Sequence, residues 1–518
     1  MACKTARAIS GKARLRRAAK SVLSCCILSL SRRVRRLGSP WQSARICLFT
    51  ALLCNAAFGL DHDRSITQFQ HTVWTTKDGA PSLILSISQT ADGYLWLGSL
   101  SGLVRFDGVR FEQYQPRFGG NFPSNEVASL FAQPDGRLWV GFIRGGVSLL
   151  IKDHVTNYGE REGLPPGRVA AFAQDQTGTV WAAVHGGGLA RLENGHWKVT
   201  GADWNFPGKT AQTAFVDRQG TLWVATEDTV VFLPRGEKSF HPTGEHIGAV
   251  CQMVEAPDGR VWLAETTRSV RPLRVPDRTA SIPEIQAGSQ AILFDEAGAL
   301  WATSLGDGIV WVDRPGELDA GTIPQNDKAV AMFTRKDGLT DDVVVSIFQD
   351  RESNIWVGTP RGLERFRNGS LVPVVFSEGY QRFAIVAGDS GTVWVGSQNR
   401  PITHVQGRQM TTHLGVPVTC AYRDPDGEIW LGGGGEVYRI IGEQISRSGS
   451  TFGHANRSAV VNAITKDRAG RLWIALGEKG IWVLKEGRWQ RYENAALPNS
   501  FVTAEYTDAQ GRLIACGD

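Results

Sequence analysis

The sequence has few methionines, and its cysteines form no pattern that predicts a disulfide framework or a metal site. It has four methionines and eight cysteines in 518 residues. Five cysteines lie within the first 60 residues, namely Cys3, Cys25, Cys26, Cys47 and Cys54. The other three, Cys251, Cys420 and Cys516, are odd in number and far apart, which argues against a disulfide framework and a metal site. We expect them to be small buried hydrophobic side chains, and we expect no metal and no cofactor.

An excess of positive charge is also absent from most of the chain. The formal net charge is +5, but residues 1–60 hold twelve Lys or Arg and no acidic residue. The remaining residues include 44 basic and 51 acidic side chains, a net charge of −7. A mildly acidic body argues against a nucleic-acid surface.

No apolar stretch is long enough for a comfortable membrane span. The apolar run from Ile46 to Phe58 follows basic clusters at residues 14–17 and 32–36, and Ala57 and Gly59 suit a cleavage site after Gly59. This pattern predicts that residues 1–60 are a signal peptide, with an N-terminal anchor as the alternative because residues 21–30 are also apolar. Export across the inner membrane, to the periplasm, is the expected location.

A repeated phrase is the strongest signal in the chain. Asp92–Gly98 (DGYLWLG) returns as Asp135–Gly141 (DGRLWVG) and in eight further copies that keep the tryptophan. The ten tryptophans are Trp96, Trp139, Trp181, Trp223, Trp262, Trp301, Trp356, Trp394, Trp430 and Trp473. An eleventh copy has Ile514 in place of Trp. Spacings of 36 to 55 residues, mostly near 42, are typical of one four-stranded propeller blade per repeat.

The repeats predict an all-β fold of four-stranded blades. We expect a first seven-bladed propeller in residues 61–370, in which a strand at Ile66–Trp74 completes the last blade and closes the ring. Residues 371–518 are expected to form about four blades of a second, incomplete propeller, so the chain is interpreted as part of something longer. The tryptophans are expected to pack between blades, and the Asp-Gly turns to be structural.

Several of these phrases resemble a known family. Trp74–Ser82, Asp92–Gly98, Gly102–Gly108 and Asn354–Thr359 are similar to the two-component regulator propeller repeat, and the resemblance extends over about residues 66–518. In that family, paired seven-bladed rings form the periplasmic sensor of a bacterial membrane histidine kinase, often a hybrid one. The sequence has no phosphoacceptor histidine motif and no ATP lid, so the resemblance implies kinase activity only in a longer parent protein.

The loops that follow the tryptophans vary while the turns do not, which is typical of binding specificity on a rigid frame. Polar candidates for ligand binding in these loops are Arg144, His185, Glu227, Arg268, Asp307 and Arg361. His185, beside three glycines, is the strongest of them. The first hypothesis is therefore a non-catalytic ligand-sensing domain for a small molecule or a saccharide.

Two alternatives remain open at this point. A propeller glycan hydrolase or lyase would need two facing carboxylates, for which Glu227 and Asp307 are the candidates; no catalytic residue is otherwise assigned. A protein-interaction scaffold is the other alternative. A homodimer is expected only through a C-terminal region outside this sequence. Membrane contact is expected only through the leader, residues 1–60, or through such a C-terminal region.

Overall fold

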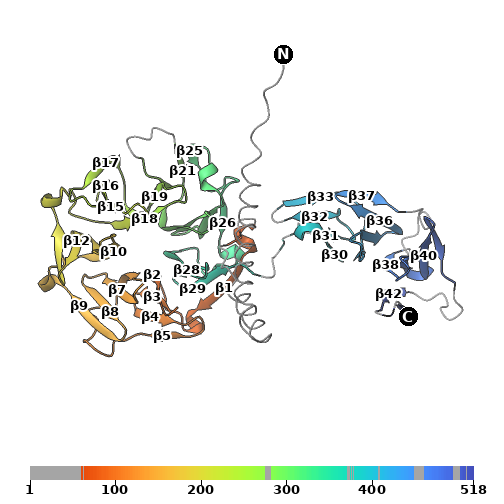
Figure 1. The fold of residues 1–518 in the computed structure, drawn as a ribbon, viewed down its shortest axis with the longest axis horizontal. Coiled ribbons are helices and arrows are strands. Elements are labelled where there is room, and N and C mark those ends of the chain that lie inside the picture. Colours follow the sequence, from red (N-terminus) through yellow and green to blue (C-terminus); the bar gives the residue numbers. More distant parts are fainter. Residues whose placement is uncertain are drawn as a thin grey trace, which may run out of the picture. The chain divides into compact units, whose positions relative to one another are not determined.

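The computed structural model describes residues 60–61, 64–274, 282–369, 374, 376, 379–406, 409–448, 460–493, 502–508, 510 and 512–517. Of the expected leader, residues 1–60, all but Leu60 lie outside this set. The described residues form mostly antiparallel strands joined by turns and loops, with no α-helix among them (Figure 1). Within them, no helical segment has the length and apolarity needed to cross a membrane. The predicted all-β fold of four-stranded blades is confirmed.

Seven sheets occupy residues 70–367, and we number them as blades in chain order (Figure 1). Blade 1 contains β2 (Ile84–Gln89), β3 (Leu95–Ser99), β4 (Gly102–Phe106) and β5 (Phe111–Gln113). Blade 2 contains β6 (Val127–Ala132), β7 (Arg137–Phe142), β8 (Val147–Ile151) and β9 (His154–Tyr158). Blade 3 contains β10 (Arg168–Gln174), β11 (Val180–His185), β12 (Gly188–Glu193) and β13 (His196–Thr200). Blade 4 contains β14 (Thr213–Val216), β15 (Leu222–Ala225), β16 (Thr229–Leu233) and β17 (His241–His246).

Blades 5 to 7 continue the same pattern with two additions. Blade 5 contains β18 (Val250–Glu255), β19 (Val261–Glu265), β20 (Val270–Pro272), β21 (Pro283–Ile285) and a fifth strand, β25 (Gly321–Ile323). Blade 6 contains β22 (Ser289–Phe294), β23 (Leu300–Ser304), β24 (Ile309–Val312) and β26 (Ala331–Phe333). Blade 7 contains β27 (Ser346–Gln349), β28 (Ile355–Thr359), β29 (Gly362–Arg367) and the N-terminal strand β1 (Gln70–Thr75).

The seven inner strands β2, β6, β10, β14, β18, β22 and β27 contact one another in this cyclic order, and β27 returns to β2. The ring is sealed by β1, which pairs antiparallel with β29 from Gln70 opposite Arg367 to Thr75 opposite Gly362. The prediction that an N-terminal strand completes the last blade is therefore confirmed. The strand begins at Gln70 rather than Ile66, because Ile66–Gln68 forms a 3₁₀ turn (η1).

The long interval between Trp301 and Trp356 has a structural explanation. The segment after β24 contributes β25, which pairs in parallel with β21 of blade 5, before the chain returns to blade 6 as β26. The segment between β24 and β26 thus adds a strand to the preceding blade.

Residues 384–517 form a second series of sheets. Blade 8 contains β30 (Ala384–Ala387), β31 (Val393–Gly396), β32 (Thr403–Gln406) and β33 (Gln409–Thr412). Blade 9 contains β34 (Cys420–Arg423), β35 (Ile429–Gly433), β36 (Glu436–Ile441) and β37 (Gln444–Arg447). Blade 10 contains β38 (Val461–Lys466), β39 (Leu472–Leu476), β40 (Ile481–Lys485) and β41 (Arg488–Arg491). Strands β42 (Val502–Thr507) and β43 (Leu513–Gly517) pair in a two-stranded sheet.

Short 3₁₀ turns connect the strands and, in the described part of the chain, are the only helical segments. They are η1, η2 (Thr76–Asp78), η3 (Glu160–Glu162), η4 (Ala202–Trp204), η5 (Pro315–Glu317), η6 (Arg335–Asp337), η7 (Asp389–Gly391) and η8 (Gly477–Lys479). In η2 and η6, Thr75 and Thr334 begin the turn with a capping box that Asp78 and Asp337 complete. These polar turns carry the chain from one blade to the next.

The repeated tryptophan fills the space between one blade and the next. Trp139 of blade 2 packs in one cluster with Val169 and Phe172 of blade 3. Trp356 of blade 7 packs likewise with Ile84 and Leu97 of blade 1. Because a buried indole removes about 150–250 Å² from water, these contacts supply much of the apolar burial between blades.

Each indole N–H needs a hydrogen-bond partner once it is buried, and the turn before its strand supplies one. Five tryptophans donate Nε1–H to an aspartate six residues earlier, at 2.6–2.9 Å: Trp181 to Asp175, Trp223 to Asp217, Trp301 to Asp295, Trp356 to Asp350 and Trp473 to Asp467. At the same place in their turns, Thr90 accepts the Trp96 indole N–H and Gln133 accepts the Trp139 indole N–H. The second oxygen of each of these aspartates accepts backbone N–H groups of its own turn, as in Asp217. The repeated turns thus anchor the indoles.

The expectation for the cysteines is wrong in part. Cys516 is exposed, and Cys251 and Cys420 are only half-buried. Cys251 stands on an inner strand, whose open edge faces the centre of the ring, so strand position alone does not bury it.

Candidate ligand-binding cavity

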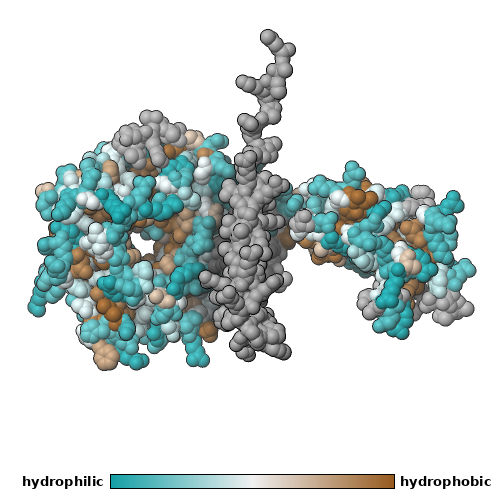
Figure 2. All heavy atoms as spheres, viewed as in Figure 1, coloured by the Kyte–Doolittle hydropathy of each residue, from teal (hydrophilic) through white to brown (hydrophobic). Residues whose placement is uncertain are grey.

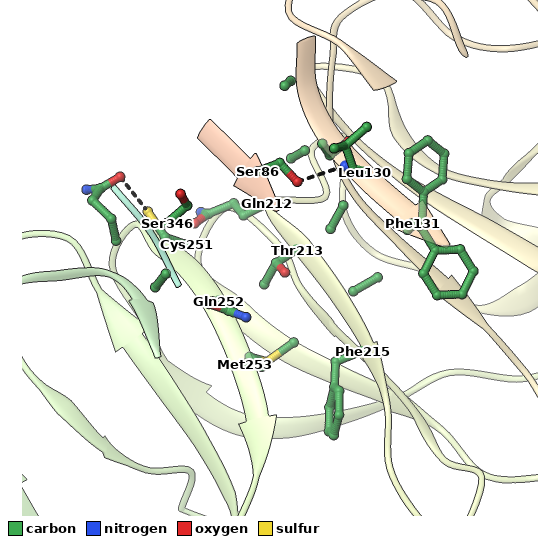
Figure 3. A pocket seen from close by; sticks show the side chains of 18 of the residues that line it. Ser86, Leu130, Phe131, Gln212, Thr213, Phe215, Cys251, Gln252, Met253 and Ser346 are labelled. Atoms are coloured by element: carbon green, nitrogen blue, oxygen red, sulfur yellow. Dashed lines mark hydrogen bonds between the residues drawn. The ribbon is translucent and has the colours of Figure 1, made fainter. Parts of the chain in front are cut away.

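A cavity of about 890 Å³ lies at the centre of the first ring and is lined by the inner strands of all seven blades. Figure 2 shows the opening in the middle of the ring. Figure 3 shows side chains from several blades around it, among them Phe131, Thr213, Gln252 and Ser346. Its volume lies in the range of small-molecule sites, about 300–1,000 Å³.

The inner strand of each blade is an edge strand of its sheet. Its N–H and C=O groups that face the centre of the ring therefore have no partner strand. Side chains of a neighbouring blade serve some of these groups. Ser86 accepts a hydrogen bond from the Leu130 amide at 2.9 Å (Figure 3), and Ser129 donates to the Val169 carbonyl at 2.8 Å. Ser346 donates to the Ile84 carbonyl at 2.7 Å, across the seam between the last and first blades. These bonds join the inner strands of adjacent blades to one another.

Two glutamines are held in a way that fixes their orientation. The Gln212 Oε1 accepts from the Val250 amide at 2.5 Å, and the Gln252 Oε1 accepts from the Ile292 amide at 2.9 Å. Because a backbone N–H can only donate, the atom facing it must be the side-chain oxygen. The NH₂ groups of both glutamines therefore remain available, and both residues line the cavity.

A third glutamine continues this arc. The Gln290 Oε1 lies 3.5 Å from the Cys251 Sγ, and this thiol also lies 3.0 Å from the Thr266 hydroxyl. Gln212, Cys251 and Gln290 stand on blades 4, 5 and 6, at the same distance before the repeated tryptophan. The corresponding lining residues on blades 7 and 1 are Val345 and Leu85. The cavity thus has a polar arc and an apolar arc at this level.

The charged side chain of the cavity wall lies at its mouth. Arg168 begins β10 and is paired in register with His185, which ends β11, and both side chains are exposed at the cavity mouth. Among the described residues that line the cavity, none is Asp or Glu. The facing carboxylates that glycoside hydrolysis requires are therefore not provided by this wall.

His185 is the one predicted ligand-binding residue that lines the central cavity. Three others are bound to the crossing segment of their own blade. Arg144 forms a bidentate ion pair with Glu126, at 2.9 and 3.1 Å, and the Arg361 Nε lies 3.0 Å from the Asp341 Oδ2. Glu227 accepts from the backbone amides of Lys209 and Thr210, both at 3.1 Å. These contacts close each blade at its loop end.

The environment of Glu227 explains its charge. Burial disfavours its ionised form, but hydrogen bonds from backbone amides, including those of Lys209 and Thr210, outweigh this and lower the pKa of its carboxyl group. A carboxylate held ionised by three amides is suited to ordering a loop rather than to donating a proton.

The remaining two predicted residues lie apart from the central cavity. Asp307 is exposed and lies 3.2 Å from the Ser304 hydroxyl in its own loop. Arg268 is exposed and lines a second cavity of about 610 Å³, beside β17 and β20. There the buried Arg271 pairs with Glu245 and Glu265. The structure thus does not bring the six predicted residues together in one site.

The polar arc was missed by sequence reasoning because the candidates were sought after the tryptophan. The arc lies ten to thirteen residues before it, where Gln212 and Gln290 occupy the position that Leu85, Ala128, Ala170 and Val345 have in other repeats. Polar side chains in an otherwise apolar inner strand were the available signal.

Comparison with known proteins agrees with this architecture. Residues 338–361 and 414–435 match the family described as Two component regulator propeller. The predicted family resemblance is therefore confirmed, and the two segments lie in blades 7 and 9. No curated protein matches the chain.

Three solved structures illustrate the likeness of fold. A structure described as the extracellular domain of a hybrid two component system, BT3049 of B. thetaiotaomicron, is 17% identical with a TM-score of 0.56, covering 86% of this chain and 70% of that one. The corresponding domain of BT4673 from the same organism is 18% identical with a TM-score of 0.47, covering 86% and 64%. A streptogramin B lyase is 14% identical with a TM-score of 0.46, covering 59% and 99%. The likeness to BT3049 shows a shared fold.

Proposed function

We propose that the chain is the extracytoplasmic sensor region of a two-component system and that its first ring binds a small molecule in the central cavity. The observation that carries the proposal is the cavity itself. Its wall of hydrogen-bonded inner strands has unengaged amide NH₂ groups on one arc and aliphatic side chains on the other. A saccharide is the first class to consider, because its hydroxyl groups and its C–H faces match two such arcs.

The family match and the extracellular domains that share the fold support a role outside the cytoplasm. In this proposal the domain performs no chemistry, and ligand binding changes the state of a transmitter carried by a longer protein. Because the lining residues come from all seven blades, a ligand in the cavity would contact the whole ring at once.

The test is calorimetric titration of the purified full-length chain with a panel of neutral and acidic oligosaccharides. Ala170→Trp places an indole in the cavity wall, and Val199→Trp places one on the exposed outer strand of the same blade as a matched control. We expect a saccharide that binds the unmodified chain and the control but not Ala170→Trp. Circular dichroism verifies the fold of both variants. Binding that survives Ala170→Trp would remove the cavity as the site, and absence of binding across the panel would contradict small-molecule sensing.

Release of shortened glycans during the titration would instead favour the hydrolase alternative. Glu227→Ala is the informative variant for that outcome. Because Glu227 binds backbone amides of its own blade, we expect its removal to leave saccharide binding unchanged.

A further inference from the structure

The side chains that line the central cavity supply many more hydrogen-bond donors than acceptors. The strand edges around the cavity present N–H and C=O groups evenly, so the side chains decide the balance. The side-chain oxygens of Gln212 and Gln252 accept hydrogen bonds from backbone amides of the next blade. Each glutamine therefore keeps two N–H donors. Gln290, with its oxygen beside the Cys251 thiol, adds a third NH₂ group.

Arg168 adds a full positive charge to the same side. It stands on blade 3, next to the arc that runs over blades 4 to 6, and its guanidinium carries five N–H donors and no acceptor. Within the described chain, no ion pair or hydrogen bond engages this side chain. With no carboxylate in the wall, the cavity has a net positive charge and a donor-rich face.

The opposite face has a different character. Leu85, Ala128 and Val345 form it at the level of the glutamines, whereas further along the strands both arcs carry apolar side chains, such as Phe131, Phe215 and Phe348. A ligand matched to the cavity therefore carries anionic and hydroxyl oxygens along one edge and C–H groups along the other. This is the pattern of a sugar acid.

We propose that the central cavity takes an acidic saccharide, whose carboxylate pairs with Arg168 and whose hydroxyl oxygens accept from Gln212, Gln252 and Gln290. This inference rests on the proposed function and adds the ligand class. A planar guanidinium matches a carboxylate in two parallel hydrogen bonds, which makes Arg168 the residue that separates acidic from neutral sugars.

The experiment compares galacturonic acid and its disaccharide with galactose and its disaccharide, because each pair differs only in a carboxylate in place of a hydroxymethyl group. Titrations use the full-length chain at low and high salt. We expect the acidic sugars to bind more tightly, and more weakly at high salt. Arg168→Gln is expected to weaken acidic-sugar binding about tenfold to a hundredfold and to leave neutral-sugar binding unchanged.

Two further variants sharpen the result. Gln252→Glu keeps an acceptor for the Ile292 amide but replaces the two donors with a negative charge, so it is expected to abolish acidic-sugar binding. Arg144→Gln removes an exposed arginine outside the cavity and serves as the control for the loss of one positive charge. Equal or tighter binding of the neutral sugars, or acidic binding that is insensitive to Arg168→Gln, would overturn the ligand class while leaving the cavity as a saccharide site. Binding of neither kind would overturn the proposed function as well.

Discussion

His71 and Glu364, which are 293 residues apart in the chain, meet across the seam that closes the first ring, with 2.5 Å between the His71 Nε2 and the Glu364 Oε2. The Glu364 side chain is fully buried, and its other oxygen accepts from the Thr340 amide at 2.9 Å. The imidazole stacks on Phe366 at 4.6 Å between ring centroids. The N-terminal strand is therefore fastened by a specific polar contact as well as by its ladder with β29.

Replacing His71 with Phe keeps the stacking on Phe366 but leaves a buried carboxylate without its imidazole partner. Because a buried carboxylate that keeps only its Thr340 partner is costly, we expect the free energy of unfolding to fall by about 2–4 kcal/mol. Hydrogen exchange is expected to rise first in β1 and β29, where the ring opens. Denaturant titration together with exchange measurements would check both effects.

The double variant His71→Phe with Glu364→Val is the matched control. By strand register, Val104, Val231 and Val310 occupy the position of Glu364 in blades 1, 4 and 6. Since an apolar side chain is the ordinary solution there, the double variant should recover most of the lost stability. A double variant as unstable as His71→Phe would show that the seam needs the polar pair itself.

Trp262 offers a test of the turns that anchor the indoles. Its Nε1–H has no partner among the described groups, because Ala256 stands where most other blades have Asp, Thr or Gln. The Ala256 turn keeps the backbone bonds of the others, from Ala256 N to Arg260 O and from Gly259 N to Ala256 O. We expect Ala256→Asp to stabilise the ring by about 1 kcal/mol, because it gains an indole hydrogen bond and backbone amide bonds. Ala256→Leu, which adds similar volume without a hydrogen-bond acceptor, is the control for the larger side chain alone. Thermal unfolding measures both, and a lower midpoint for Ala256→Asp would contradict this account.

The architecture was predictable from sequence because one physical constraint recurs in every blade. Each four-stranded sheet needs a large side chain to fill the wedge beside the next sheet, and Trp139 and Trp356 mark it at a regular interval. The closing role of the N-terminal strand also follows, since a ring cannot close without pairing its last outer strand.

The candidate site was less predictable because the sequence does not say which polar loop residues are already engaged. Arg144 and Glu126 are 18 residues apart, as are Glu227 and Lys209, and only the fold brings each pair together. In the cavity wall, the sequence does not show which polar groups remain available. Gln212 and Gln252 resemble ordinary strand residues until the adjacent blade shows that their oxygens are engaged and their NH₂ groups are not.

In the second series of sheets, Lys466 of blade 10 joins blade 9 and produces a defined dependence on pH. Its Nζ lies 2.8 Å from the Asp424 Oδ2 and 2.9 Å from the Asp426 Oδ2. Burial opposes ionisation of Asp424, but the bond and charge of Lys466, together with backbone amide bonds from Glu428 and Asp426, outweigh it and lower the pKa of the carboxyl group. The bonds to Asp424 and Asp426 raise the pKa of Lys466 above its ordinary value of 10.5.

The directions of these two pKa shifts define the pH range in which the contact stabilises the fold. The contribution of Asp424 is present above its ordinary pKa of 3.8 and is lost as pH falls through its lower folded value. The contribution of Lys466 is present below pH 10.5 and is lost as pH rises through its higher folded value. We expect Lys466→Met to destabilise the contact between blades 9 and 10 by about 1–2 kcal/mol inside this window and by less outside it. Hydrogen exchange in β34 and β38 reports the contact, and Lys485→Met, an exposed lysine of the same blade, is the control. An effect of Lys466→Met that stays constant into strong acid would contradict the ion-pair account.

Cys251 provides a chemical probe of the central cavity that needs no substitution. Its half-buried thiol lines the cavity, where it contacts Thr266 and Gln290, whereas the Cys516 thiol is exposed. A thiol reacts through its thiolate and only where reagent can reach it, so we expect a small maleimide to modify Cys516 first and Cys251 more slowly. A saccharide bound in the cavity should slow modification of Cys251 severalfold and leave the rate at Cys516 unchanged. Peptide mapping by mass spectrometry separates the two sites, and Cys420, which packs beside Trp430 in the second series of sheets, is an internal reference. Equal slowing at Cys251, Cys420 and Cys516 would indicate general stabilisation of the chain. No slowing at Cys251 by a saccharide that does bind would place that saccharide outside the cavity.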